Sequence, residues 1–290
     1  MDITYAIKQA LDDGCRWLTI GAGGNFWGLL DGQGNNIGGI NLDAYAGSGN
    51  NSLVLEGPGP YNAQINRRFN PDISPVFYTE NTGWDIHLRG VSFVDFHDYT
   101  PASPSPLVWF QNVGGSYVKN SLFENGHAMQ GPGQIGGNGD GLRLGPDQAA
   151  IITLIAPKAY NNGDNGIYID NGLCIAGFGA MVERNDNSNR VNGAQIRLRG
   201  TPYAARGAAA FLGTHVEVEG GHPRGIVASR WRALRVAGGD FYEGGVICAA
   251  DATENIVEGI ALRASDVSFS DPVSDERCNV KADGCGNPLP

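Results

Sequence analysis

The stretch NGDGLRLGPDQAAIITLIAPKAYNNGDNGIYIDNGLCIAGFGAMVERNDN, residues 138–187, contains two copies of one unit. GLRL at 141–144 corresponds to GIYI at 166–169, at an offset of 166 − 141 = 25 residues. AYNNG at 159–163 corresponds to VERND at 182–186, at an offset of 182 − 159 = 23 residues. Each copy holds two short alternating strands separated by Gly, Asn and Asp. A period of roughly 20 to 50 residues is typical of a solenoid, and strands without helices predict a β-solenoid.

Composition agrees with one domain rich in turns. The chain has 290 residues, of which 44 are glycines and only 17% are charged. Glycine allows the positive φ angles that tight turns need, and an elongated solenoid can exceed the usual domain length. The net charge of −10 argues against nucleic acid as a partner, because phosphate binding depends mainly on Lys and Arg. It leaves room for an acidic sugar bound by a local Arg cluster.

Membrane, export and metal signals are missing from the sequence. No apolar run reaches the roughly 18 residues of a membrane span, and Met1 is followed by Asp2 rather than by a signal peptide. We therefore expect no membrane insertion. The five cysteines lack metal-site spacing, and we expect no metal and no other cofactor. Cys174 and Cys248 are expected to be buried in strands, while Cys278 and Cys285 either form a disulfide or stay free.

Residues 2–14 predict the one helix of the chain, with Asp2 as N-cap and Gly14 just after its end. Its apolar stripe would cover the open end of a solenoid. We expect residues 1–20 to form this cap and the first strand. Residues 21–271 would form the solenoid, and the proline-containing segment 272–290 an extended tail.

A recurring apolar position before a polar turn marks successive turns of the solenoid. It is occupied by Phe93, Leu122, Ala159, Val182, Val216, Phe241 and Val267. These spacings predict turns of about 23 to 26 residues, with insertions at 128–137 and 201–210.

Stacked parallel strands place equivalent residues about 4.8 Å apart, with alternate side chains pointing inward. The pairs expected to point inward are Leu142/Leu144, Ile167/Ile169, Ile196/Leu198, Ile226/Ala228 and Val246/Cys248. The residues between them form an outward ladder of Arg143, Tyr168, Arg197, Val227 and Ile247.

The sequence resembles the right-handed parallel β-helix superfamily, which includes pectate lyases, polygalacturonase-like hydrolases and bacteriophage tailspikes. Residues 2–12, DITYAIKQALD, are similar to the D-T-x-A-I-x-x-A-I-D helix that opens the pectate-lyase-like domain of many tailspikes. Family members continue with a strand ending in P-G-x-Y, whereas residues 21–24 are GAGG. The resemblance covers roughly residues 1–270. It implies an all-β fold, a right-handed parallel β-helix with a short N-terminal capping helix.

The same resemblance implies two candidate catalytic carboxylates. NGDG at 138–141 resembles the N-T-D-G segment of polygalacturonase-like hydrolases, which implies a catalytic role for Asp140, with Asp164 one turn later. Glycoside hydrolysis needs two carboxyl groups about 5 to 10 Å apart, one protonated and one ionised. The family's G-H-G and R-I-K motifs are missing. NGDG is also ordinary turn chemistry, the interpretation we favour.

The outward residues Arg143, Tyr168 and Arg197 are the strongest candidates for substrate binding. Guanidinium groups bind carboxylates bidentately, and an aromatic ring stacks on the apolar face of a sugar. The alternative is a solvated strand face in which neighbouring side chains stack by cation–π contacts.

A lyase would use a different set of residues. At the mouth of the first predicted insertion, Glu124 is a further catalytic candidate and His127 a further binding candidate. Lys158, one turn on, is another binding candidate. Lyases need a base that removes a proton α to a uronate carboxylate and a cation that neutralises that carboxylate. The sequence leaves the base undecided, and His127 is also typical of a turn.

These features favour a virion-associated tailspike or tail-fibre-like protein that binds a bacterial surface polysaccharide and, if it is an enzyme, cleaves it. The resemblance implies a homotrimer. One alternative is a free extracellular polysaccharide lyase or glycoside hydrolase. Another is a non-enzymatic β-solenoid with an adhesive or structural role. The expected location is the virion or the extracellular space.

Overall fold

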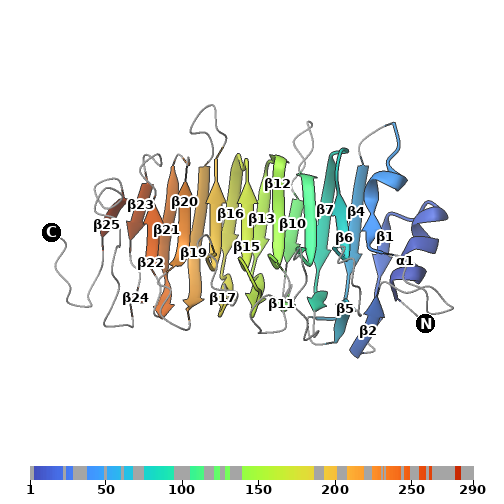
Figure 1. The fold of residues 1–290 in the computed structure, drawn as a ribbon, viewed down its shortest axis with the longest axis horizontal. Helices are drawn as coiled ribbons and strands as arrows, with labels where there is room; N and C mark the ends of the chain where they lie inside the picture. Colours follow the sequence, from blue (N-terminus) through green and yellow to red (C-terminus); the bar gives the residue numbers. More distant parts are fainter. Residues whose placement is uncertain are drawn as a thin grey trace.

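The computed structural model shows an elongated chain whose strands stack side by side along the long axis (Figure 1). It describes residues 3–21, 24–28, 38–48, 51–59, 62–67, 75–94, 105–113, 121–124, 128–130, 139–185, 193–200, 208–218, 224–229, 231, 233–242, 245–248, 255–258, 261–262 and 278–281. For 24–28, 121–124, 128–130, 148, 224, 245–248, 255–258, 261–262 and 278–281 the backbone alone is described. The fold is all-β with parallel strands and one N-terminal α-helix.

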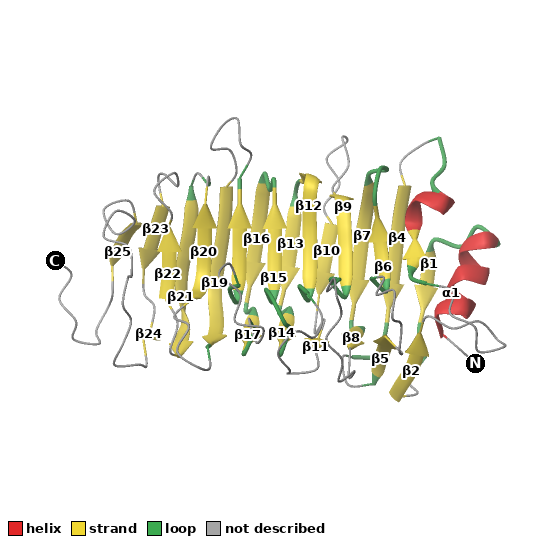
Figure 2. Ribbon diagram, in the orientation of Figure 1, coloured by secondary structure: helices red, strands yellow, loops and turns green. Residues whose placement is uncertain are grey.

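Helix α1 (Ile3–Asp12) lies at one end of the stack (Figure 2). Its residues Ile7 and Leu11 are buried and join the hydrophobic core. Gly14 ends it with a φ of +84°, and its N–H donates to the carbonyl of Leu11 at 3.0 Å, as the sequence predicts. The expected N-cap, Asp2, lies outside the described residues. In the part of the chain described, no helix is long and apolar enough to cross a bilayer.

The described strands form three ladders of parallel pairs. The first ladder consists of β1 (Trp17–Thr19), β4 (Asn51–Glu56), β7 (Trp84–Arg89), β10 (Ser121–Glu124), β13 (Ile152–Ile155), β16 (Cys174–Phe178), the first parts of β19 (Ala208–Glu217) and β21 (Leu234–Tyr242), β23 (Asn255–Glu258) and β25 (Cys278–Lys281). The second ladder consists of β3 (Ile40–Asn41), β6 (Phe77–Thr79), β9 (Val108–Val113), β12 (Leu142–Ala149), β15 (Ile167–Asp170), β18 (Ile196–Arg199), β20 (Arg224–Ser229) and β22 (Gly245–Cys248). The third ladder consists of β2 (Gly24–Gly28), β5 (Ala63–Arg67), β8 (Ser92–Val94), β11 (Ala128–Gln130), β14 (Lys158–Tyr160), β17 (Met181–Glu183), the second parts of β19 and β21, and β24 (Ala261–Leu262).

The chain visits the ladders in a fixed order. From β4 in the first ladder it passes to β5 in the third, then to β6 in the second, and returns to the first at β7. A short 3-10 helix, η1 (Leu42–Tyr45), follows β3. Because each strand pairs with its equivalent in the next circuit, the apolar side chains form one continuous core.

The predicted repeat is confirmed on the second ladder. Leu142 pairs with Ile167, and Arg143 with Tyr168, as the alignment of the two copies requires. The same register continues through Arg197, Val227 and Ile247. The inward residues with described side chains are all at most 1% exposed: Leu142, Leu144, Ile167, Ile169, Ile196, Leu198, Ile226 and Ala228.

The predicted series of apolar positions is wrong at Leu122. This residue belongs to the first ladder, where it pairs with His87 and Thr153. Met129 pairs instead with Phe93 and Ala159 on the third ladder. Both Leu122 and Met129 are apolar residues in short strands, so polarity alone does not tell which ladder each joins. The final member of the series, Val267, lies outside the described residues.

Strands also occupy parts of the segments that were expected to be irregular. Residues 128–130 form β11, and residues 208–210 begin β19, so the two insertions are shorter than predicted. Within the expected tail of 272–290, β25 pairs in parallel with β23. The first ladder therefore continues into that segment, because backbone pairing with the preceding circuit satisfies its hydrogen bonds.

The expectation of a buried Cys174 is wrong. Its side chain is exposed, because the alternation of β16 turns Ile175 and Gly177 inward instead. Only the backbone is described for Cys248 and Cys278, and Cys285 lies outside the described residues. The possible disulfide therefore stays a prediction.

Candidate functional site

Aromatic and guanidinium groups alternate on the outward face of the second ladder. Trp109, Arg143, Tyr168 and Arg197 occupy equivalent positions on β9, β12, β15 and β18. The Cζ atom of Arg143 lies 4.9 Å from the ring centroid of Trp109 and 5.0 Å from that of Tyr168. The Cζ atom of Arg197 lies 5.6 Å from the Tyr168 centroid. We call these four residues the stacked strip.

The aromatic rings of the stacked strip are held by hydrogen bonds at their polar ends. Trp109 Nε1 donates to the carbonyl oxygen of Gly145 at 2.8 Å. The Tyr168 hydroxyl donates to Asp170 Oδ2 at 3.3 Å, and Arg199 Nη1 lies 3.8 Å from the same oxygen. Burial raises the pKa of Tyr168, so its phenol stays protonated at neutral pH. The rings therefore form a fixed surface.

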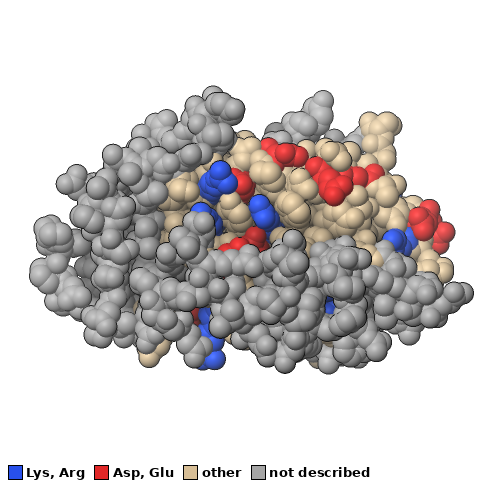
Figure 3. Space-filling model, viewed as in Figure 1, with Lys and Arg blue, Asp and Glu red and all other residues tan. Residues whose placement is uncertain are grey.

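Exposure differs along the stacked strip. Tyr168 is only 8% exposed because its ring lies under the guanidinium groups, whereas the Arg143 side chain keeps 30% of its surface accessible. Arg143 Nε is buried and has no hydrogen-bond partner, so the stacking holds this group more than polar contacts do. Because the Arg143 side chain is partly accessible, its guanidinium group is a candidate for binding an anion. In the space-filling view, basic and acidic atoms lie close together near the middle of the visible face (Figure 3).

Asp140 lies beside the stacked strip in the turn before β12. Its Oδ2 lies 3.8 Å from Arg143 Nη1, and its Oδ1 accepts hydrogen bonds from Asn165 N at 3.1 Å and Asn165 Nδ2 at 2.6 Å. Burial raises the pKa of Asp140 to about 6, and the charge of Asp164 adds to the rise. Arg143 and the hydrogen bonds from Asn165 lower this pKa, but they do not cancel the effect of burial.

The structure places Asp140 and Asp164 in consecutive circuits, as expected. The N–H of Asp164 donates to the carbonyl of Gly139 at 3.1 Å, which joins the turns before β12 and β15. Asp140 is 3% exposed, whereas Asp164 is half-buried. The pair therefore combines one carboxyl group whose protonated form is favoured with a second carboxyl group that is more accessible.

Two of the residues expected for lyase chemistry lie on other ladders than the stacked strip. Glu124 ends β10 on the first ladder, and its side chain is not described. Lys158 begins β14 on the third ladder, where it is half-buried. His127 lies outside the described residues. Glu124 and Lys158 thus belong to other ladders than Arg143.

Trp109 is the member of the stacked strip that sequence reasoning missed. The predicted outward ladder begins at Arg143 and leaves this residue out. The structure buries Trp84 and Trp231 completely, and the side chain of Trp27 is not described. The step from Trp109 to Arg143 spans 34 residues (143 − 109), longer than the repeat that revealed the register. The alternation of apolar residues in β9 is the sequence signal that could have placed Trp109 on the outward face.

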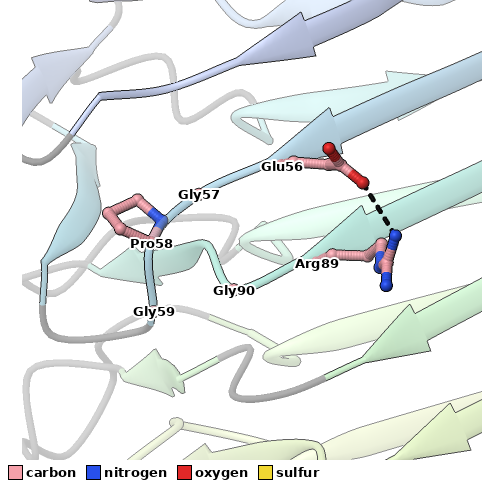
Figure 4. A pocket seen from close by; sticks show the side chains of 6 residues that line it. All are labelled: Glu56, Gly57, Pro58, Gly59, Arg89 and Gly90. Carbon is pink, nitrogen blue, oxygen red and sulfur yellow. Dashed lines mark hydrogen bonds and ion pairs between the residues drawn. The ribbon is translucent and has the colours of Figure 1, made fainter.

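A pocket of ≈ 320 Å³ lies where the first ladder turns towards the third. It is lined by Glu56, Gly57, Pro58, Gly59, Arg89 and Gly90 (Figure 4). Arg89 Nη1 donates to Glu56 Oε1 at 2.8 Å, so the two charged groups neutralise each other. A Cβ atom on Gly90 would lie 2.4 Å from the carbonyl oxygen of Gly57, which explains why glycine is needed here. The pocket thus lies where the turns after β4 and β7 approach each other closely.

Side chains suited to holding a metal ion occur on the third ladder rather than in the stacked strip. Glu183, His215 and Glu217 place one possible ligand atom each within 4.8 Å of one another. This is the group with metal-like geometry in the described part of the chain. The expectation of no metal rested on cysteine spacing and did not consider these residues.

Comparisons with known proteins add little to this geometry. No protein-family model and no curated protein matches the sequence. One solved structure, described as the crystal structure of the Agl-KA catalytic domain, is 13% identical and aligns with a TM-score of 0.33. The alignment covers 90% of this chain and 55% of that chain, so this chain spans about half the length of that protein. Because the TM-score is low, the site has to be interpreted from its own residues.

Proposed function

We propose that the chain is a right-handed parallel β-helix whose stacked strip binds an acidic bacterial surface polysaccharide. In this proposal it is part of a virion-associated tailspike or tail-fibre-like protein. The observation that carries the proposal is the alternation of Trp109, Arg143, Tyr168 and Arg197 along one outward face. Three ladders of parallel strands, visited in a fixed order, support the β-helix.

The chemistry of the stacked strip fits an extended acidic glycan better than a small ligand. Arg143 and Arg197 lie two circuits apart, which is about 10 Å at the spacing of paired strands. Each guanidinium can bind a separate sugar carboxylate, and the half-buried Trp109 offers an aromatic surface beside them. The rings and guanidinium groups are already ordered by stacking, so binding costs little side-chain entropy.

A binding experiment with the double variant Arg143→Ala/Arg197→Ala tests this function. Affinity for a uronate-containing capsular or lipopolysaccharide glycan should fall at least tenfold, because each charge-assisted contact contributes about 1.5 to 3 kcal/mol. The melting temperature should change little. Lys8→Ala/Arg235→Ala removes the same charge from α1 and the first ladder and should bind normally. Equal affinity of the two double variants for the glycan would contradict glycan binding by the stacked strip.

Cleavage by Asp140 and Asp164 is the second candidate function. The raised pKa of Asp140, about 6, supports a general acid, and the more accessible Asp164 is its candidate partner. Product analysis separates the alternatives. New reducing ends without unsaturated sugars indicate a hydrolase, unsaturated ultraviolet-absorbing products indicate a lyase, and unchanged glycan indicates a binding protein.

A homotrimer is part of the tailspike proposal. Phe178 is 42% exposed at the end of β16, in register with the half-buried Ile155 and Leu212 of neighbouring strands. An apolar line of this kind on the first ladder supports contact with a second copy of the chain. A stable monomer would count against the tailspike, which makes the molar mass informative.

A further inference from the structure

Four ionisable side chains converge on the third ladder, away from the stacked strip. Glu183 ends β17 and is in register with Glu217 of β19. His215 of β19 is in register with Asp240 of β21. His215 and Glu217 lie on the same side of β19, two residues apart, because side chains alternate along a strand. Three consecutive circuits therefore direct a His and three carboxylates to one place.

The distances between these groups fit a metal site. His215 Nε2 lies 3.5 Å from Glu183 Oε1 and 4.0 Å from Glu217 Oε2. Ligand atoms about 2.0 to 2.2 Å from a tetrahedral zinc ion are separated by roughly 3.3 to 3.6 Å. The first distance already meets this range, and the second needs only a small movement of the half-buried Glu217 carboxylate.

The groups behind the ligands supply an independent indication. A histidine that binds a metal usually donates its other ring N–H to a carboxylate, which orients the imidazole. Asp240 Oδ2 lies 3.6 Å from His215 Nδ1 and is placed for this role. Arg184 donates from Nε and Nη2 to Glu217 Oε1 at 3.1 and 3.0 Å. The other Glu217 oxygen, Oε2, is the one that lies nearest to His215 Nε2.

We propose that Glu183, His215 and Glu217 bind a divalent transition-metal ion, with zinc as the best fit, while Asp240 and Arg184 orient the ligands. Imidazole with carboxylates suits zinc, and three protein ligands leave a fourth position for water. The ligand side chains are 25% to 32% exposed, so the ion can enter from solvent. The ion would join β17 to β19 and so fasten one circuit to the next.

The alternative is a cluster in which these side chains contact only one another and hold no metal. Titration of the metal-free full-length chain with Zn²⁺ near neutral pH, against a chromophoric chelator, separates the two. We expect His215→Ala to bind one zinc ion fewer per chain than the wild type does. Added Zn²⁺ should raise the melting temperature of the wild type only. His87→Ala, which removes a half-buried His from the first ladder, should behave as the wild type.

Two further variants keep the test informative if His215→Ala folds poorly. Glu183→Gln should weaken zinc binding by removing a ligand charge, and Asp240→Asn should weaken it about 10- to 100-fold through the orientation of the imidazole. Co²⁺ in the wild type should give the intense visible absorption of a four-coordinate site. Zinc binding that is equal in the wild type, Glu183→Gln and Asp240→Asn would overturn the proposal, as would a wild type that binds no zinc.

Discussion

Asp140 shows how burial can outweigh favourable contacts at a single residue. It accepts two hydrogen bonds from Asn165 and lies 3.8 Å from Arg143, and both neighbours favour the carboxylate. Removal from water nevertheless raises its pKa to about 6. The folded protein therefore holds a proton on Asp140 at a pH where the unfolded chain has lost it.

This difference predicts a pH dependence of stability. Between the ordinary pKa of 3.8 and about 6, the folded state binds more protons at this site than the unfolded state does. The free energy of unfolding therefore falls as pH rises through this window, by on the order of 3 kcal/mol from this group. Asp140→Asn removes the titration. Urea unfolding at about pH 4 and about pH 7 should show the variant gaining stability relative to the wild type at the higher pH.

The same variant separates a catalytic from a structural Asp140. Asn keeps the shape of the side chain and still accepts from Asn165, so the fold should persist. If Asp140 is the acid of a hydrolase, glycan cleavage should be lost while binding is retained. A variant with normal turnover and the expected gain in stability would leave Asp140 with its turn role alone.

Among the elements, the turn before β15 is packed closely against the next circuit. A Cβ atom on Gly166 would lie 2.6 Å from Val182 Cγ1 and 2.7 Å from Asn185 Nδ2. Asn185 is itself fixed, since its Nδ2 donates to Gln195 Oε1 at 2.7 Å and its Oδ1 accepts from Asn162. The neighbours cannot move without breaking buried amide contacts between circuits.

Gly166→Ala should therefore destabilise the protein by about 1 to 3 kcal/mol, the usual cost of forcing extra volume into a packed interior. Chemical denaturation of the purified variants measures this. Gly21→Ala is the matched control, because a Cβ there meets no atom within 4 Å and should change stability by about 0.5 kcal/mol or less. Similar midpoints for the two variants would contradict this account of the turn.

Strand register could be predicted where two circuits have similar lengths. The pairing of Leu142 with Ile167 follows from the 25-residue repeat (167 − 142) and the alternation of polarity. The pairing of Phe93 with Met129 could not be predicted, because the longer circuit offers Leu122 as an equally apolar choice. The alternation of inward and outward side chains can be recognised from neighbouring residues within one strand. The number of residues in a circuit depends on its turns, and the size of a turn leaves no periodic signal in the sequence.

Part of the candidate metal site was within reach of the sequence. Val182 and Val216 were placed at equivalent positions, which implies that Glu183 and Glu217 are neighbours, as the structure confirms. The approach of His215 and Asp240 to the same point also depends on side-chain rotamers. Those are set by packing across strands and cannot be obtained from the pattern of residues.

At the scale of the whole molecule, the stack has two ends and three outward faces that differ in chemistry. Helix α1 lies at one end (Figure 1) and buries Ile7 and Leu11 against the core. The second ladder carries the stacked strip, and the third carries the candidate metal site. The first ladder carries the exposed Phe178. A trimer that uses the first ladder would leave the other two faces open to glycan and metal.

The proposed trimer predicts a mass three times the 30.6 kDa of one chain in light scattering coupled to size-exclusion chromatography. Phe178→Ser with Leu212→Ser should shift the protein towards monomer, because both side chains lie on the apolar line of the first ladder. Tyr242→Ser removes a similarly exposed side chain, 44% accessible, from the third ladder and should leave the trimer intact. A wild-type monomer at micromolar concentration would contradict the tailspike assembly while leaving glycan binding by the stacked strip open to its own test. Loss of glycan binding in the serine double variant, with the stacked strip unchanged, would show that affinity depends on several strips acting together.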